Sequence, residues 1–151
     1  MTATHPHRAP VGAEVAVIAV GGGIGSLLRY CIERGLPHDA SAFPSATLLI
    51  NLLGSFLLGA LVIAVTEVRH AHPLVRPALG TGLLGGFTTF STFAVEARTA
   101  PAGTAIAYIG ASVFGGIALA FVGMQLVRSL AGVHVTETDE DEIDPIDPDL
   151  P

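Results

Sequence analysis

Tryptophan and lysine are both missing from this 151-residue chain, and charged residues of any kind are scarce. Only 13% of the residues are charged, whereas 50% are hydrophobic. This balance is typical of a membrane protein rather than of a soluble globule. All seven basic residues are arginines, and they are spread along the chain, so no basic cluster predicts nucleic-acid binding.

Cysteine is nearly absent as well, because Cys31 is the only one. A single thiol excludes a disulfide within the chain and a thiolate metal cluster. Cys31 is therefore expected to pack as a small apolar residue, and a reactive thiol is the alternative.

Four long apolar segments dominate the chain. They run over approximately residues 15–31, 45–66, 74–97 and 102–127. A helix needs about 20 residues to cross a bilayer, and helices satisfy their own backbone hydrogen bonds in lipid. The short connections favour antiparallel neighbours. We therefore predict an all-α membrane protein with four transmembrane helices, which form one domain over residues 14–130.

Both ends of the chain differ from the apolar segments. Residues 1–13 contain prolines and histidines, and we treat them as an N-terminal extension. Residues 131–151 hold eight of the thirteen acidic residues and end in DPIDPDLP. Such a segment buries too little apolar surface to fold, so we expect an acidic, disordered C-terminal tail.

The arginines are almost evenly divided between the two sides of a four-helix arrangement. If the N-terminus is cytoplasmic, Arg8, Arg69, Arg76 and Arg128 lie inside, and Arg29, Arg34 and Arg98 lie outside. The positive-inside rule needs a clear asymmetry to fix one orientation. Two interpretations are open: insertion in both orientations with pairing as an antiparallel homodimer, or one orientation set by weaker signals.

The sequence GGGIGSLLRY, residues 21–30, also permits two interpretations. Gly21, Gly23 and Ser26 nearly match a dinucleotide-binding fingerprint, but no βαβ pattern surrounds them. Close helix packing is favoured, with Gly21, Gly22 and Gly25 letting another backbone approach.

The third segment contains GGFTTFSTFAVE, residues 85–96, where Leu, Ile and Val would be usual. Its glycines and threonines favour a helix poorly, so we predict a break in the third helix. A break frees carbonyl oxygens at mid-membrane depth, where irregular backbone is tolerated only against protein, water or an ion. Carbonyls at broken helices are one way to bind a hard cation such as Na⁺.

Beyond the break, the spacing predicts two neighbouring stripes on a helix. Thr88, Thr92 and Glu96 fall at i, i+4 and i+8 on one face, and Phe90 and Phe93 lie beside them. Phenyl edges are electropositive, and hydroxyls donate hydrogen bonds, so these stripes can face a small anion. Mild donors suit a pore, which must release its ion. Core packing for the phenylalanines and a surface position for Glu96 are the alternatives.

Polar side chains in the other segments fall at similar depths. Asn51 lies alone in the second segment, and Tyr108 and Ser112 are four residues apart in the fourth. In hydrocarbon such groups face protein or water. Each of these residues, taken singly, is explained by an interhelical hydrogen bond. Taken together with residues 85–96, the three residues predict an anion pathway. Arg29 either extends its charge to the membrane surface or lines an anion vestibule.

The four segments resemble the CrcB/Fluc family of fluoride channels over approximately residues 15–127. The resemblance is carried by GGGIGSLLRY (21–30), NLLGSFLLG (51–59) and GGFTTFSTF (85–93) followed by Glu96. It implies a fluoride-specific channel in the plasma membrane that lets cytoplasmic fluoride leave passively and gives fluoride resistance, without an enzymatic reaction. It also implies a dual-topology antiparallel homodimer with a broken third helix.

The resemblance further assigns roles to residues. It implies a structural Na⁺ at the dimer interface, held by the backbone carbonyls of Gly85 and Thr88 from both subunits. The fluoride-pore positions that it implies are Asn51, Phe90, Ser91, Thr92, Phe93, Glu96, Tyr108 and Ser112, with Arg29 near the entrance. A second hydroxyl that some members carry one turn after Ser112 is replaced by Gly116.

Two other functions compete with this one. Small dual-topology multidrug/proton exchangers are also four-helix antiparallel dimers, and Glu14 is a candidate coupling carboxylate. Glu14 lies at the edge of its segment, however, and aromatic residues that could bind a cation are scarce. A non-transporting membrane scaffold would account for small-residue pairs such as Ser55 and Gly59 but not for the polar stretch.

Overall fold

The computed structural model describes residues 9–36, 43–68 and 72–132. These residues form helices and short turns, with no strand in the described ranges. Helix α1 covers Val11–Gly35, α2 covers Ser45–Ile63 and α5 covers Ala102–Ala131. The π-helical turn η1 (Ala64–Val68) extends α2. The third segment consists of the π-helical η2 (Pro77–Leu84), α3 (Gly85–Phe87) and α4 (Phe90–Thr99).

Four helical stretches are long and apolar enough to cross a membrane. They are Val11–Gly35, Ser45–Val68, Pro77–Thr99 and Ala102–Ala131. The prediction of an all-α protein with four membrane-capable helices is confirmed. The first and fourth stretches extend several residues beyond their predicted ends, and large apolar side chains are exposed along all four. Such a surface needs a cover of lipid or protein.

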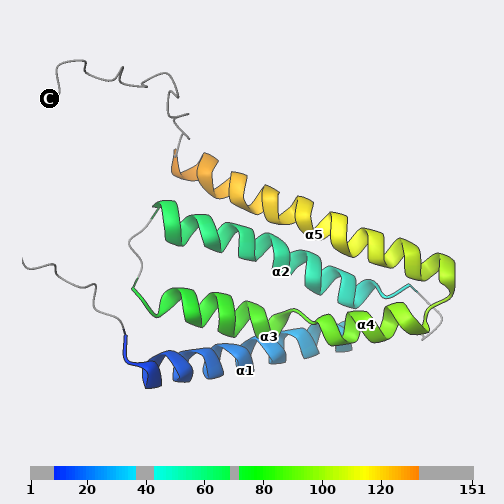
Figure 1. Ribbon diagram of the computed structural model, residues 1–151, viewed down its shortest axis with the longest axis horizontal. Coiled ribbons are helices and arrows are strands. Elements are labelled where there is room, and N and C mark those ends of the chain that lie inside the picture. The colour runs from blue at the N-terminus through cyan, green and yellow to red at the C-terminus, as the bar shows by residue number, and fades with distance from the viewer. Residues whose placement is uncertain (1–8, 37–42, 69–71, 133–151) are drawn as a thin grey trace, which may run out of the picture.

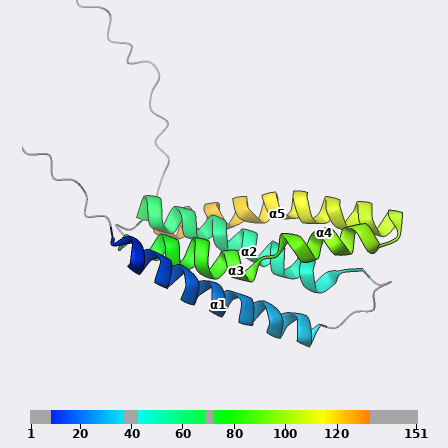
Figure 2. The same cartoon turned by 60° about the horizontal axis from the view of Figure 1, so that its bottom comes forward.

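The four stretches alternate in direction and lie side by side (Figure 1). One end of the bundle, which we call the η1 end, holds Val11, Val68, Pro77 and Ala131. The opposite end, which we call the α4 end, holds Gly35, Ser45, Thr99 and Ala102. Helix α1 lies alongside the third stretch and away from α5, as Figure 2 also shows.

Glycines bring α1 into backbone contact with the third stretch. A Cβ atom on Gly25 would collide with the carbonyl oxygen of Leu83, and one on Gly86 would collide with that of Gly22. A Cβ atom on Gly21 would lie 2.5 Å from the carbonyl oxygen of Ala78. The predicted role of the first-segment glycines in close helix packing is therefore confirmed.

The second close contact joins α2 to α5. A Cβ atom on Gly59 would collide with the carbonyl oxygen of Ala120, and one on Gly123 would collide with that of Phe56. The described helices therefore form two tight pairs, α1 with η2 and α3, and α2 with α5.

Helical geometry does not continue through the middle of the third stretch. Helix α3 ends at Phe87, and Thr88 has extended backbone angles, φ −78° and ψ 161°. Thr89 is also extended, with φ −145° and ψ 120°, and α4 begins at Phe90. Two residues with extended backbone therefore separate α3 from α4, close to the middle of the stretch (Figure 1).

One inference from helical spacing does not hold. Thr88 precedes α4, so it does not share the helical face of Thr92 and Glu96. Its hydroxyl instead donates a hydrogen bond to the carbonyl oxygen of Leu84, 3.0 Å away. Spacing of i and i+4 places two residues on one face only when the residues between them are helical.

The terminal segments of our sequence division fall largely outside the described residues. The proposed N-terminal extension, residues 1–13, is described only from residue 9 onwards. The predicted acidic tail, residues 131–151, lies outside the described residues after position 132.

Candidate functional site

Asn51 of α2 holds the extended segment between α3 and α4. Its Nδ2 atom donates to the carbonyl oxygen of Thr89 at 3.1 Å. The backbone N–H of Thr89 donates in turn to Asn51 Oδ1 at 2.9 Å. The side-chain amide therefore pairs with both backbone groups of one residue, which replaces hydrogen bonds that a continuous helix would have made.

The Thr89 side chain organises the start of α4. Its Oγ1 accepts a hydrogen bond from the backbone N–H of Thr92 at 3.1 Å, which caps the helix. The same hydroxyl donates to Thr92 Oγ1 at 3.1 Å and lies 3.2 Å from Ser91 Oγ. Thr89 is only 7% exposed, whereas Thr92 is half-buried and Ser91 is exposed, so the three hydroxyls lead from the interior to the surface.

These hydrogen bonds divert the usual helical donors from two carbonyl groups. In a continuous helix the N–H of Thr89 would bond to the carbonyl of Gly85, and that of Thr92 to the carbonyl of Thr88. Here the first bonds to Asn51 and the second to the Thr89 hydroxyl. The carbonyls of Gly85 and Thr88 therefore receive no helical hydrogen bond and keep their capacity as oxygen ligands.

A second polar cluster surrounds Glu96 of α4. The Thr47 hydroxyl donates to Glu96 Oε1 at 2.9 Å, and the Tyr108 hydroxyl donates to Oε2 at 2.8 Å. Thr47 is 1% exposed and Tyr108 is fully buried. Glu96 is therefore not a simple surface acid, because both of its carboxylate oxygens accept hydrogen bonds from buried hydroxyls.

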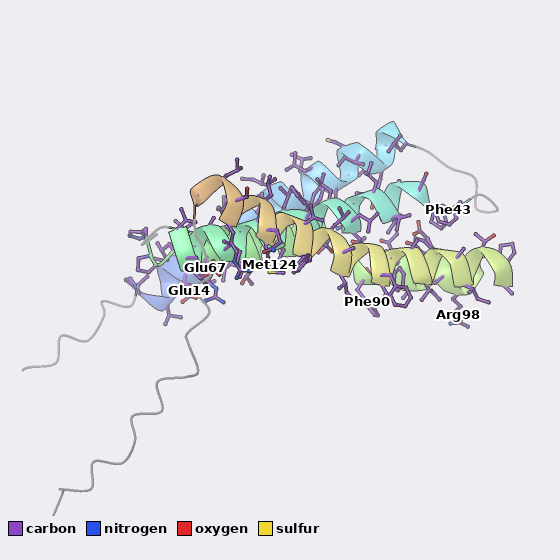
Figure 3. All side chains as sticks on the ribbon, turned by 90° about the horizontal axis from the view of Figure 1, so that it is seen from above. Glu14, Phe43, Glu67, Phe90, Arg98 and Met124 are labelled. Atoms are coloured by element: carbon purple, nitrogen blue, oxygen red, sulfur yellow. The ribbon has the colours of Figure 1, made fainter. Side chains whose placement is uncertain are left out.

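Aromatic rings lie beside both clusters. The ring centroids of Phe90 and Phe93 are 5.8 Å apart, and those of Phe93 and Tyr108 are 5.2 Å apart. Phe43 makes an edge-on contact with Tyr108 at 5.8 Å. Phe90 is 80% exposed and projects from the outer side of the helix bundle (Figure 3), so lipid or another chain must cover it.

A cavity of about 430 Å³ opens beside the extended segment. Its lining includes Asn51, Ser55, Gly85, Thr88, Thr89, Phe90, Phe93 and Ser112. The Ser112 hydroxyl is buried and has no hydrogen-bond partner within the described chain. A buried hydroxyl without a partner is unusual in a folded protein, so it marks a place where a bound ion or water molecule can be accommodated.

Most of the predicted site residues lie in or next to this cavity. Asn51, Phe90, Phe93, Ser112, Gly85 and Thr88 line it. Ser91 and Thr92 adjoin it through the Thr89 hydroxyl cluster, and Tyr108 and Glu96 adjoin it through Phe93. The structure therefore brings together groups from α2, the third stretch and α5.

Two other candidates lie elsewhere. Arg29 does not line the cavity, and its guanidinium is 3.9 Å from Glu33 on the same helix. Glu14 lies in the first turn of α1 at the η1 end, as Figure 3 shows, rather than at mid-depth.

Sequence reasoning missed several members of the site. Thr47, Asn51 and Ser55 recur every four residues and share one face of α2, and this spacing could have identified Thr47. Ser55 donates to the carbonyl of Asn51 at 2.8 Å. Thr89 and Phe43 carried no comparable signal, because their roles depend on the extended backbone and on contacts between distant segments.

The site can bind a small ion weakly without a full positive charge in its lining. Its donors are one amide and several hydroxyls, and its rings can present electropositive edges. No group of three His, Cys, Asp or Glu side chains is positioned for a metal ion in the part of the chain that the structure describes. Oxygen ligands are available instead from the backbone carbonyls of Gly85 and Thr88, because the N–H groups that would bond to them in a helix bond elsewhere.

The fold and the cavity define the class: this is a multi-pass membrane protein with a weakly polar cavity beside Thr88 and Thr89 of its third membrane-capable stretch. Residues 16–124 match the model of a family described as CrcB-like protein, Camphor Resistance (CrcB). The chain belongs to this family, and the resemblance noted from its sequence motifs is confirmed.

Individual relatives are similar over most of the same region. The chain is 47% identical over 109 residues to "Fluoride-specific ion channel FluC 1" of Streptomyces coelicolor, covering 70% of this chain and 69% of the relative. It is 46% identical over 109 residues to "Fluoride-specific ion channel FluC 2" of Streptomyces avermitilis, covering 70% and 67%. It is 41% identical over 122 residues to "Fluoride-specific ion channel FluC" of Rhizobium etli, covering 78% and 98%.

Proposed function

We propose that this protein is a fluoride-specific ion channel that lets cytoplasmic fluoride leave passively and so gives fluoride resistance. The cavity beside Thr88 and Thr89 carries the proposal, because it gathers weak hydrogen-bond donors and phenyl rings inside a membrane-spanning bundle. Relatives named as fluoride channels support the choice of ion.

The donors in the cavity suit a small anion that must shed part of its water. One hydrogen of Asn51 Nδ2 goes to Thr89, and the amide has a second hydrogen to offer. The Ser112 hydroxyl has no protein partner and can also donate. Phe90 and Phe93 add ring edges without adding charge. Weak sites of this kind bind an ion and still release it.

The remaining polar residues extend the same path. We assign Ser91, Thr92, Glu96 and Tyr108 to its lining on the α4 side, where they form the two hydroxyl-rich clusters. Arg29 is assigned to an entrance, where a guanidinium attracts anions. Fluoride reaches the cytoplasm as neutral HF, which dissociates inside. The membrane potential then drives the anion out, so no ATP is needed.

The working unit that we propose is an antiparallel, dual-topology homodimer assembled around the broken third helix. Two observations support it. The described arginines are divided between the η1 end, with Arg76 and Arg128, and the α4 end, with Arg29, Arg34 and Arg98. In addition, Phe90 is largely exposed beside the cavity, so a second copy would complete the lining that one subunit leaves open.

A structural Na⁺ between the two subunits is part of this proposal. The carbonyl oxygens of Gly85 and Thr88 fit this group, because their helical donors are diverted to Asn51 and Thr89. Carbonyl oxygens suit hard cations, and two subunits would supply four such ligands. The bound cation would hold the two extended segments together.

Fluoride efflux from liposomes tests the proposed function. The purified protein is reconstituted into vesicles loaded with potassium fluoride, and valinomycin is added to relieve the electrical limit on anion release. A fluoride electrode should record rapid release that does not change when a pH gradient is imposed. Vesicles without protein are the control, and equal fluoride retention in both would reject the channel.

The same vesicles distinguish the competing functions. Proton-driven uptake or loss of a lipophilic cation without fluoride release would favour the exchanger. If the protein remains dispersed and folded in detergent but shows neither fluoride release nor cation transport, the scaffold is favoured. Crosslinking of opposed single-cysteine variants in the membrane tests the antiparallel dimer separately.

A further inference from the structure

A second cavity, of about 310 Å³, lies towards the η1 end. It is lined by Leu58, Leu61, Val62, Val65, Thr66, Arg76, Gly80 and Thr81. Leu58 and Gly80 also line the central cavity, so both cavities border these two residues. A mainly aliphatic wall with two threonines and one arginine therefore lies between the η1 end of the bundle and the central cavity.

The charge of Arg76 is not neutralised within the described chain. Arg76 is exposed and forms no ion pair with any described residue. Arg128, at the same end, is different, because its Nε and Nη2 atoms donate to Glu67 at 2.9 and 2.6 Å. The described lining of the second cavity therefore carries one positive charge, that of Arg76, whereas the charge of Arg128 is paired with Glu67.

Two threonines lie close to this charge. The Thr66 hydroxyl donates to the carbonyl of Val62 at 2.7 Å, so only its oxygen lone pairs face outwards. The Thr81 hydroxyl has no hydrogen bond among the described residues and can donate to an anion. Arg76 and Thr81 thus supply a strong and a weak donor on one wall of the cavity.

We infer that the Arg76 cavity is an entrance site for small hydrated anions, which pass between Leu58 and Gly80 into the central cavity. This inference rests on the proposed function and adds an electrostatic entrance to it. A cleft lined by one sign of charge raises the local concentration of its counter-ion. Because Arg76 lies at the mouth rather than in the central cavity, it attracts the ion without holding it along the path.

Of the two residues that border both cavities, Leu58 has a large side chain and Gly80 has none. A Cβ atom on Gly80 would lie 3.7 Å from Leu61 Cδ2, which is ordinary contact. Alanine therefore fits at position 80, whereas a large side chain would fill space beside Gly80, which borders both cavities. Gly80→Ala and Gly80→Phe form a matched pair that separates obstruction from loss of the glycine itself.

The first experiment measures fluoride current across planar bilayers at fluoride concentrations well below saturation. Arg76→Gln should lower the current about 3-fold to 10-fold at low ionic strength. The loss should shrink to less than about 2-fold near 1 M of an impermeant salt, because salt screens exposed charges. Arg76→Lys should restore most of the current, since it restores the charge.

Arg34→Gln is the matched control. Arg34 lies at the α4 end, with its guanidinium 5.9 Å from the ring centre of Tyr30, and it lines neither cavity. Its replacement removes the same charge and should leave the current within about 2-fold of wild type. Equal currents for Arg76→Gln and Arg34→Gln, or a loss for Arg76→Gln that salt does not change, would overturn the inference.

The second experiment examines the junction. Gly80→Phe should reduce the current at least 10-fold, and Gly80→Ala should reduce it far less, because alanine adds only one methyl group at ordinary contact distance. Both variants must keep the wild-type gel-filtration profile for the comparison to count. Wild-type current through a folded Gly80→Phe variant contradicts the path through this junction.

Failure of the inference and failure of the proposed function give different results. If wild-type protein carries no fluoride current, the proposed function is wrong. If wild-type protein conducts and the Arg76 and Gly80 variants conduct equally well, the channel stands and only the entrance is wrong.

Discussion

Asn51 and Thr89 form two reciprocal hydrogen bonds, at 3.1 and 2.9 Å, between a side-chain amide of α2 and the backbone of the extended segment. They join residues 38 positions apart and connect the two tight helix pairs of the bundle. Asn51 therefore helps to position the start of α4, and the hydrogen bonds that Thr47 and Tyr108 donate to Glu96 hold the same helix further along.

Replacing Asn51 with alanine should destabilise the protein and abolish fluoride transport. The change leaves both backbone groups of Thr89 without their partner, and an unsatisfied buried group costs about 1–3 kcal/mol. Thermal unfolding in detergent and the liposome assay measure the two effects. Ser55→Ala is the stability control, because it removes only a hydroxyl that bonds within its own helix. Equal melting temperatures for both variants would contradict this interpretation.

Phe90→Ile and Phe93→Ile should each reduce fluoride flux while leaving the protein folded. Isoleucine keeps an apolar side chain but removes the electropositive ring edge. Phe90 is the cleaner test, because it is 80% exposed and its loss opens no cavity within the chain. Flux and gel-filtration profile are measured together, and wild-type flux in both variants would reject an edge-on role for the rings.

Tyr108→Phe should lower fluoride flux and reduce stability by about 1–2 kcal/mol. The variant keeps the ring contacts with Phe93 and Phe43 but removes the hydroxyl that donates to Glu96 at 2.8 Å. Tyr30→Phe is the matched control, since Tyr30 is exposed on α1. An unchanged melting temperature and flux in Tyr108→Phe would show that the hydrogen bond to Glu96 is dispensable.

Gly25→Ala should disrupt the pairing of α1 with the third stretch. Its new methyl group would collide with the carbonyl oxygen of Leu83, so the helices must separate. Gly23→Ala adds the same methyl group where no atom lies within 4 Å, and it should be harmless. Yield of folded protein and melting temperature distinguish the two, and equal behaviour would argue against tight packing at Gly25.

Deletion of residues 135–151 should leave fluoride transport unchanged. The segment is acidic and lies beyond the four membrane-capable stretches. The truncated and full-length proteins are compared in the liposome assay at equal protein content. Loss of transport in the truncated protein would assign a function to the acidic tail.

The four spans could be predicted from the sequence because each is a long apolar run, and composition alone determines how such a run partitions into lipid. The glycine contacts of α1 were also predictable in kind, since clustered small residues allow close approach. The partners were not, because the sequence does not say which backbone meets Gly25.

The sequence predicted most of the residues of the candidate site, but it did not predict which of them bond to one another. A lone amide at Asn51 signals a need for a partner, yet its partner lies 38 residues away and only the folded chain brings them together. The sequence pattern predicted that Thr88 begins a helical face. In the structure, Thr89 caps α4, and the Thr88 hydroxyl donates to the carbonyl of Leu84, four residues earlier. Which of two adjacent threonines takes the cap depends on the tertiary contact with α2.

The interruption at Thr88 and Thr89 also has an electrical consequence. Peptide dipoles add along a helix, so its C-terminal end is partly negative and its N-terminal end partly positive. The end of α3 and the beginning of α4 meet across these two residues, so opposite partial charges lie close together inside the membrane. The peptide bond itself thereby brings partial charges of both signs to the middle of this stretch, without the large cost of an ionised side chain at Thr88 or Thr89 in hydrocarbon.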